Sequence, residues 1–194
     1  MKLMNMSYRE DKVLSLAGDG PAGLDRGELQ KQCAALVNAK MHGLCFSPYE
    51  GDQQPGDTFT EVQVRRKLEL LQPHTEWIRI FSCTDGNDMI PKLAREYGFK
   101  TLVGAWLGEE KDKNEEEMAR LIELANEGVV DVAAVGNEVL YREEMSEEEL
   151  IACIDRVRNA LPDVPVGYVD AYYEFADRPQ LSEACDVILA NCYP

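Results

Sequence analysis

The apolar residues of this chain alternate between short strand-like runs and longer segments with helical spacing. Six short runs are rich in β-branched and aromatic residues, as expected of buried parallel strands. They begin near His42, Glu76, Phe99, Asp131, Val164 and Asp186. Their starts lie roughly 20–35 residues apart, which leaves room for a helix between successive parallel strands.

The segments between these runs carry recognisable helix starts and stops. The predicted starts are Thr58 with Glu61, Asn114, and Ser146 with Glu149, and the predicted stops are Gly98 and Gly128. A further helix is expected over residues 25–40, ahead of the first strand. The charged run at residues 111–117 is interpreted as a solvated loop and helix start.

Six βα steps indicate an α/β fold with a parallel sheet and helices outside it. A doubly wound sheet and a (β/α)8 barrel both fit this alternation. No G-x-G-x-x-G or Walker loop follows any strand-like run, which disfavours the nucleotide-binding version. The preferred prediction is an incomplete (β/α)8 TIM barrel over residues 25–194 that includes the N-terminal helix, after a loosely ordered segment at residues 1–24.

Polar and aromatic residues lie at the ends of most strand-like runs, where a barrel places its active site. These residues are Tyr49, Arg79, Trp106, Glu138, Asp170, Tyr172, Asn191 and Tyr193. Each has a structural explanation when taken alone: Arg79 could pair inside the barrel, and Trp106 could close the core. Their coincidence at successive strand ends favours a binding site.

The pair Asn137-Glu138 ends the apolar run Val129–Val135. A carboxyl group buried at a strand end could hold a proton near neutral pH and donate it to a leaving oxygen. The neighbouring Asn137 could hydrogen-bond a sugar hydroxyl. These residues alone leave open that Glu138 is a surface residue at the start of a loop.

Composition narrows the function classes. The formal net charge of −16 argues against nucleic acid or an anionic membrane as partner. No apolar run reaches the length of a membrane span, and no signal core is visible, so a cytoplasmic location is expected. With His42 and His74 as the two histidines, no His-rich metal centre is expected. The six cysteines occur singly and are interpreted as buried free thiols.

The chain resembles glycoside hydrolase family 17, the β-1,3-glucanase and glucanosyltransferase family, in its bacterial form. Five segments carry the resemblance, in the same order as the strand ends: 43–49 (GLCFSPY), 77–83 (WIRIFSC), 104–108 (GAWLG), 135–142 (VGNEVLYR) and 190–194 (ANCYP). The resemblance covers about residues 40–194, and the Val-Gly-Asn-Glu-Val block is its most specific part.

This resemblance implies a retaining enzyme that uses no cofactor and acts on β-1,3-glucan. Glu138 would be the general acid/base, Asn137 would contact the 2-hydroxyl of the sugar that is attacked, and Tyr193 would hold the nucleophile in place. Candidates for stacking on sugar rings are Tyr49, Trp106, Tyr141 and Tyr172. Phe46 and Phe81 stand where many relatives carry Tyr, so some hydroxyl contacts are expected to be lost.

The family's nucleophilic Glu lies after a seventh strand, and the sequence contains six strand-like runs. The chain is therefore interpreted as truncated and inactive by itself. Asp170 and Glu174 are the nearby carboxylates that could substitute as nucleophile, which strand placement disfavours. The alternative from another class is a glucan-binding pseudoenzyme without catalysis.

Overall fold

The computed structural model describes residues 23–192. Helix α2 (Arg26–Asn38) begins after Asp25, whose side chain accepts hydrogen bonds from the backbone of Gly27 and Glu28. The compact unit that contains the sheet spans Lys40–Tyr193, and α2 belongs to a separate unit. The helix predicted over residues 25–40 is thus present, but the barrel unit begins at Lys40. The prediction of loose order at residues 1–24 falls almost entirely outside the described residues.

The sheet consists of six parallel strands that are hydrogen-bonded in the order in which they occur in the chain. The strands are β1 (Met41–Cys45), β2 (Thr75–Ile80), β3 (Lys100–Ala105), β4 (Val132–Asn137), β5 (Val166–Ala171) and β6 (Val187–Asn191). A doubly wound sheet would reverse its strand order, and this sheet does not. The predicted partial TIM barrel is confirmed, and the doubly wound alternative is wrong.

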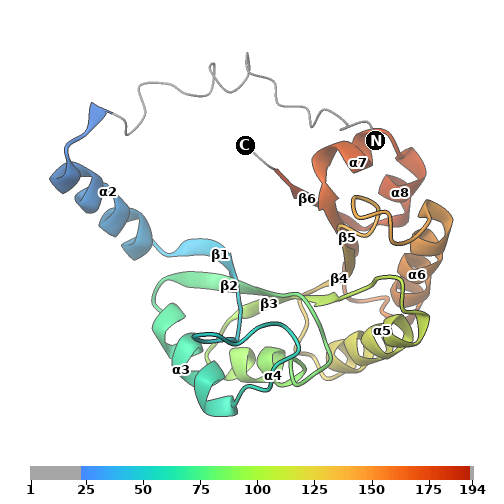
Figure 1. Cartoon of the computed structure of the whole chain (residues 1–194), viewed down its shortest axis with the longest axis horizontal. Helices are drawn as coiled ribbons and strands as arrows, with labels where there is room; N and C mark the ends of the chain where they lie inside the picture. Colours follow the sequence, from blue (N-terminus) through green and yellow to red (C-terminus); the bar gives the residue numbers. More distant parts are fainter. Residues whose placement is uncertain (1–22, 193–194) are drawn as a thin grey trace. The chain divides into compact units, whose positions relative to one another are not determined.

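Helices connect the strands and lie on the outer side of the curved sheet (Figure 1). They are α3 (Glu61–Leu71), α4 (Met89–Glu96), α5 (Lys111–Asn126), α6 (Glu147–Ala160), α7 (Tyr172–Ala176) and α8 (Pro179–Ala184). The core fills the layer between helices and sheet, with fully buried residues such as Ile78, Val103, Leu121 and Ile154. Burial of these apolar side chains fixes the strand ends that carry the site.

Two of the predicted helix starts are wrong. Helix α3 is capped by Thr60 rather than Thr58, because Thr60 and Gln63 exchange side-chain and backbone hydrogen bonds in a capping box. Asn114 lies inside the first turns of α5, where its amide bonds both the N–H and the carbonyl of Gly108 instead of capping the helix. The capping box of Ser146 with Glu149 is confirmed.

On β2 and β3 the inner face of the sheet is more exposed than the face covered by helices. Strand register places Gly43, Trp77 and Lys100 side by side on the inner face. Two residues further along each strand, Cys45, Arg79 and Leu102 are side by side in the same way. All six cysteines are free, but only Cys83 is buried, whereas Cys33, Cys45 and Cys192 are exposed. The predicted burial of the thiols is therefore wrong for most of them, since β1 offers no covered face to Cys45.

Within residues 23–192, no cluster of His, Cys, Asp and Glu side chains could hold a metal ion. The same part of the chain contains no helix with the length and apolar character needed to cross a membrane.

Candidate active site

An irregularity near the end of β4 places Asn137 and Glu138. The register of β4 against β5 shifts between Ala134 and Asn137, as in a β-bulge. Gly136 has φ of +86°, and a Cβ atom there would lie 3.0 Å from a methyl group of Val139. Glu138 itself has φ of +55°, which is uncommon for a residue with a side chain. Bulges redirect side chains next to active sites, and this one turns the Asn-Glu pair at the strand end.

Glu138 is half-buried and held at two points. Its backbone N–H donates to the carbonyl of Val169 on β5, at 2.8 Å. Its carboxylate Oε1 accepts a hydrogen bond of 2.7 Å from Nδ2 of Asn191, at the end of β6. Glu138 is therefore fixed by both its backbone and its side chain, at the rim where strands β4, β5 and β6 end.

Asn137 is held by two arginines. Its Oδ1 accepts a hydrogen bond of 2.5 Å from Arg79 of β2, and its backbone carbonyl accepts one from Arg142. Burial lowers the pKa of the Arg79 guanidinium, and the negative charge of nearby Glu138 is among the effects that oppose this. Arg142 also pairs with Glu144 at 2.7 Å. These contacts bring Arg79, Asn137, Glu138 and Asn191 together.

Asp170 lies behind this group instead of facing the open side. It is 0% exposed, and its carboxylate accepts hydrogen bonds from the Tyr168 hydroxyl and from the backbone N–H of Ala171. Burial raises the pKa of Asp170, and the charge of Glu138 adds to that rise. Tyr168 in turn accepts a hydrogen bond of 3.0 Å from the backbone of Leu140. Asp170 thus supports the segment after Glu138, and its burial leaves no surface for the predicted contact with substrate.

Three predicted aromatic contacts are exposed near this rim. Trp106, Tyr141 and Tyr172 each show 42–45% of their surface to solvent. The guanidinium of Arg142 lies 4.8 Å from the centre of the Trp106 ring. Tyr172 packs edge-on against Tyr173, with ring centres 5.3 Å apart. Exposed rings near a carboxyl group offer flat apolar surfaces to sugar C–H faces.

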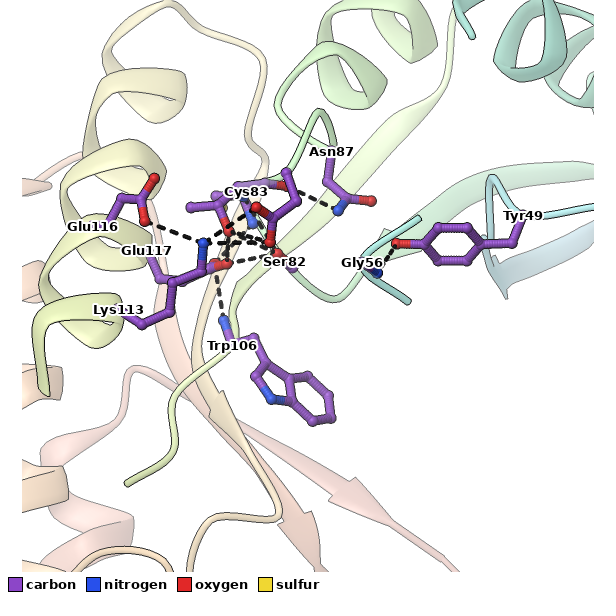
Figure 2. A network of polar contacts seen from close by, with 11 residues as sticks. Tyr49, Gly56, Ser82, Cys83, Asn87, Trp106, Lys113, Glu116 and Glu117 are labelled. Carbon is purple, nitrogen blue, oxygen red and sulfur yellow. Dashed lines mark hydrogen bonds and ion pairs between the residues drawn. The ribbon is translucent and has the colours of Figure 1, made fainter. Parts of the chain in front are cut away.

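Tyr49 stands away from the Glu138 group, in a pocket at the ends of β1, β2 and β3. The pocket encloses about 570 Å³, and Trp106 also lines it. The Tyr49 hydroxyl accepts a 3.3 Å hydrogen bond from the backbone of Gly56, and its ring packs edge-on against Phe59 (Figure 2). Tyr193, the remaining predicted site residue, lies outside the described residues.

Sequence reasoning missed two residues that shape this region. Arg142 follows the Asn-Glu pair in a short turn, where no periodic pattern reveals its contact with Asn137. Glu117 stands in the charged run that was interpreted as solvated, but it is 1% exposed and accepts four hydrogen bonds. The one available signal was its place next to Met118 and four residues before Leu121, both on the buried side of α5.

Known proteins resemble this chain in sequence. A glucan 1,3-beta-glucosidase of Arthroderma benhamiae is 27% identical over 147 residues, which are 74% of this chain and 47% of that protein. A glucan 1,3-beta-glucosidase of Candida albicans is 24% identical over 144 residues, or 65% of this chain and 46% of that protein. The chain thus spans about half the length of these relatives.

Solved structures share the fold. A glycoside hydrolase family 17 beta-1,3-glucanosyltransferase from Rhizomucor miehei superposes with a TM-score of 0.69 and 22% identity, over 81% of this chain and 59% of that one. An endo-laminarinase from Formosa superposes with a TM-score of 0.66 and 19% identity, over 84% of this chain and 52% of that one.

The family comparison is the most direct. The model of the BtgE/BtgC glycoside hydrolase domain matches residues 43–194, which include every segment that carried the resemblance to glycoside hydrolase family 17. Because this match covers most of the sequence, the chain belongs to the BtgE/BtgC glycoside hydrolase domain family.

Proposed function

We propose that the protein containing this chain is a retaining glycoside hydrolase or transglycosylase that acts on β-1,3-glucan, with Glu138 as its general acid/base. The observation that carries the proposal is the fixed carboxyl group of Glu138 at the carboxyl end of β4. Relatives named glucan 1,3-beta-glucosidase support the substrate class. A related enzyme from Rhizomucor miehei has been solved as an active-site mutant with laminaritriose.

In this proposal Glu138 first donates its proton to the glycosidic oxygen as the bond to the leaving sugar breaks. A second carboxylate attacks the anomeric carbon and forms a glycosyl-enzyme. Glu138, now ionised, then removes a proton from water or from a sugar hydroxyl, which attacks the same carbon and releases the second carboxylate. Water gives hydrolysis, and a sugar hydroxyl gives transfer.

The surrounding residues would prepare Glu138 for both steps. Asn191 donates to Oε1, so the proton of the neutral acid would reside on Oε2. The bond from Arg79 to Asn137 leaves the two N–H donors of the Asn137 amide for a sugar hydroxyl. Both contacts fix side-chain positions before substrate binds, which reduces the cost of ordering the site.

Neither nearby carboxylate supports the role of nucleophile. Asp170 is fully buried and bonded to Tyr168. Glu174, in α7, pairs with Arg178, while burial raises the pKa of its carboxyl group. A retaining mechanism needs its two carboxyl groups about 5–5.5 Å apart. We propose that the nucleophile lies beyond the described residues, after a seventh strand.

The proposal can be tested with a form of the protein that extends past residue 194 through two further βα units. It should hydrolyse laminarin or transfer its glucosyl units, whereas residues 1–194 alone should do neither. An activated 2-fluoro glycosyl donor should label one Glu after the seventh strand. If the extended protein binds laminarin but neither cleaves nor transfers it and takes up no label, the protein is a glucan-binding pseudoenzyme instead.

A further inference from the structure

The backbone around Glu138 has an uncommon shape. The backbone angle φ is positive at Gly136 (+86°), at Glu138 (+55°) and at Glu143 (+58°). Within residues 23–192, the other residues besides glycine with positive φ are Lys40 and Asp85. A residue with a side chain keeps such a conformation only where surrounding contacts hold it in place. The contacts that hold this segment therefore also decide where the Glu138 carboxyl group lies.

Strand β5 supplies hydrogen-bond acceptors to the residues that follow β4. The carbonyl of Val169 accepts a hydrogen bond of 2.8 Å from the backbone N–H of Glu138. The hydroxyl of Tyr168, one residue earlier, accepts a hydrogen bond of 3.0 Å from the backbone N–H of Leu140. Two neighbouring residues of β5 thus hold Glu138 and the residue two positions after it.

Tyr168 makes a second contact with this segment, through its ring. A Cβ atom at Gly136 would lie 3.3 Å and 3.5 Å from two ring carbons of Tyr168, so the ring packs directly against the glycine. The side chain of Tyr168 is 0% exposed, and its ring centre lies 5.8 Å from that of Phe175 in α7. Tyr168 therefore touches the chain on both sides of Glu138, at Gly136 and at Leu140.

Asp170 orients the hydroxyl of Tyr168. The hydroxyl donates to the Asp170 carboxylate, which leaves its oxygen free to accept from Leu140. Burial raises the pKa of Tyr168, and the hydrogen bond to Asp170 adds to that rise, so the hydroxyl keeps the proton that it donates. Asp170 is itself held by the backbone N–H groups of Ala171, at 2.7 Å, and Tyr141, at 3.4 Å. The direction of the Tyr168 hydroxyl is thus fixed at both of its hydrogen bonds.

Tyr168 and Asp170 offer no surface to a substrate, since both are 0% exposed. The side chain of Asn137 is held separately, by the hydrogen bond from Arg79. The hydroxyl of Tyr168 therefore acts on the residues after Asn137, and among these Glu138 is the residue with a proposed role in proton transfer.

We propose that Tyr168 is a positioning residue of the acid/base: by holding Gly136 and Leu140 it keeps the Glu138 carboxyl group where it exchanges protons with the substrate, and Asp170 keeps the Tyr168 hydroxyl directed for this task. The inference rests on the proposed function, since it takes Glu138 as the acid/base. Such support from buried neighbours reduces the motion of a reacting group before the substrate binds.

The test uses the protein extended past residue 194. Tyr168→Phe keeps the ring against Gly136 but leaves the N–H of Leu140 without its acceptor. It should lower kcat on laminarin about 10-fold, less than the loss expected of Glu138→Gln itself. KM should stay unchanged, because the contacts of Asn137 are independent of the hydroxyl. Tyr97→Phe, in a partly buried tyrosine just before β3 begins, is the matched control and should leave kcat unchanged.

A double-mutant cycle separates positioning of Glu138 from a general loss of structure. Once Glu138→Gln has removed proton transfer, the hydroxyl of Tyr168 has no acid/base to position. Adding Tyr168→Phe to Glu138→Gln should therefore lower kcat on laminarin no further. An activated donor with a good leaving group needs little protonation, so Tyr168→Phe alone should leave the burst of its released leaving group nearly unchanged.

Each outcome bears on the proposal. A loss of kcat in Tyr168→Phe that disappears in the Glu138→Gln background would support it. An equal loss in both backgrounds, or no loss in either, would overturn it while leaving the proposed function intact. Turnover of laminarin that Glu138→Gln leaves unchanged, or an extended protein without activity, would overturn the proposed function and this inference with it.

A second variant covers the case in which Tyr168→Phe does not fold. Asp170→Asn has one acceptor oxygen in place of two, so it cannot serve both Tyr168 and Ala171. It should lower kcat on laminarin in the parent and not in Glu138→Gln, and an equal loss in both backgrounds would overturn the proposal in the same way.

Discussion

Asn191 donates a hydrogen bond of 2.7 Å to the carboxylate of Glu138, which joins the end of β6 to the end of β4 across β5. The two residues are 53 positions apart in sequence, so the fold alone brings them together. The contact fixes the carboxyl group of Glu138 through its Oε1 atom. It also makes the position of the Glu138 carboxyl group depend on β6.

The first prediction concerns Glu138 in the extended, active form of the protein. Glu138→Gln keeps the shape of the side chain but cannot transfer a proton, so turnover of laminarin should fall by about 10²–10⁴. A substrate with a good leaving group needs little protonation, and its first step should suffer less. The measurement is kcat on both substrates, with Glu143→Gln, an exposed neighbour, as the control. Unchanged turnover of laminarin in Glu138→Gln would mean that another residue is the acid/base.

A second prediction concerns rescue of the same site. Glu138→Ala lacks the base that activates water in the second step, but the nucleophile would still form the glycosyl-enzyme. Azide needs no general base, so adding it should restore part of the turnover of an activated substrate. The product should be a β-glycosyl azide, because two displacements retain configuration. An α-glycosyl azide, identified by NMR, would contradict the retaining mechanism.

The third prediction concerns Gly136, which shapes the bulge before Glu138. In Gly136→Ala the alanine would have to keep φ of +86°. Its Cβ atom would lie 3.0 Å from Val139 and 3.3 Å from Tyr168. The backbone strain alone should cost about 1–2 kcal/mol of unfolding free energy. Gly128→Ala is the control, since it has φ of +78° but no atom within 4 Å of the new Cβ. Denaturant titration should show a larger loss for Gly136→Ala, and laminari-oligosaccharide affinity should fall in that variant alone.

Equal losses of stability in the two glycine variants would mean that Val139 and Tyr168 move aside at little cost. Equal affinities for laminari-oligosaccharides would mean that the bulge tolerates a side chain without moving Asn137 and Glu138.

The strands and most helices could be predicted because their signals are local and repeat along the sequence. The Ser146 and Glu149 pair predicts its capping box, and the run before Asn137 predicts β4. Thr58 was predicted as the start of α3 because Glu61 follows it by three positions, but Thr60 has the same spacing to Gln63. The choice depends on Gln63, whose amide also donates to Gln53 of the preceding loop at 2.8 Å, and no local pattern contains that contact.

The candidate site was predicted as a set of strand ends, but not as a set of contacts. Asp170 was correctly placed at the end of β5, but its burial and the hydrogen bond that it accepts from the Tyr168 hydroxyl were not predicted. Glu117 was missed because it is one of three consecutive glutamates. Which of the three is buried depends on which face of α5 packs against the sheet. Side-chain partners across strands are set by the fold, and sequence spacing does not record them.

The fourth prediction concerns the helix layer. Ile154 of α6 is fully buried between the helices and the sheet. Ile154→Ala should cost about 2–5 kcal/mol of unfolding free energy, from lost burial and the cavity it leaves. Ile188 of β6 is 47% exposed, so Ile188→Ala should cost clearly less. Urea titrations of both variants measure the difference, and a similar loss in the two would mean that α6 does not stabilise the sheet as its burial implies.

The fifth prediction concerns the pH dependence that Asp170 gives to stability. Burial is the main cause that raises the pKa of this carboxyl group, and the hydrogen bonds from Tyr168, Ala171 and Tyr141 oppose the rise. An acid with a higher pKa in the folded than in the unfolded state binds its proton more tightly when folded. Its contribution to stability is therefore present in full below its unfolded pKa of about 3.9 and is lost as pH rises through the folded pKa.

Asp170→Asn removes this titration while keeping the shape of the side chain. The unfolding free energy of the parent chain minus that of Asp170→Asn should therefore fall as pH rises from about 4 to 7, by about 1.4 kcal/mol for each unit by which the pKa is raised. Glu96→Gln is a control in which the pH dependence should run in the opposite direction. Hydrogen bonds from Arg65 lower the pKa of exposed Glu96, so its small contribution to the unfolding free energy is lost as pH falls. Urea titrations from about pH 4 to 7 measure the difference for Asp170→Asn, and titrations below about pH 4.3, the ordinary pKa of a glutamate, measure that for Glu96→Gln. A difference for Asp170 that stays constant or rises with pH would mean that the hydrogen bonds from Tyr168 and its neighbours outweigh burial, and that Asp170 is an ordinary ionised carboxylate behind the site.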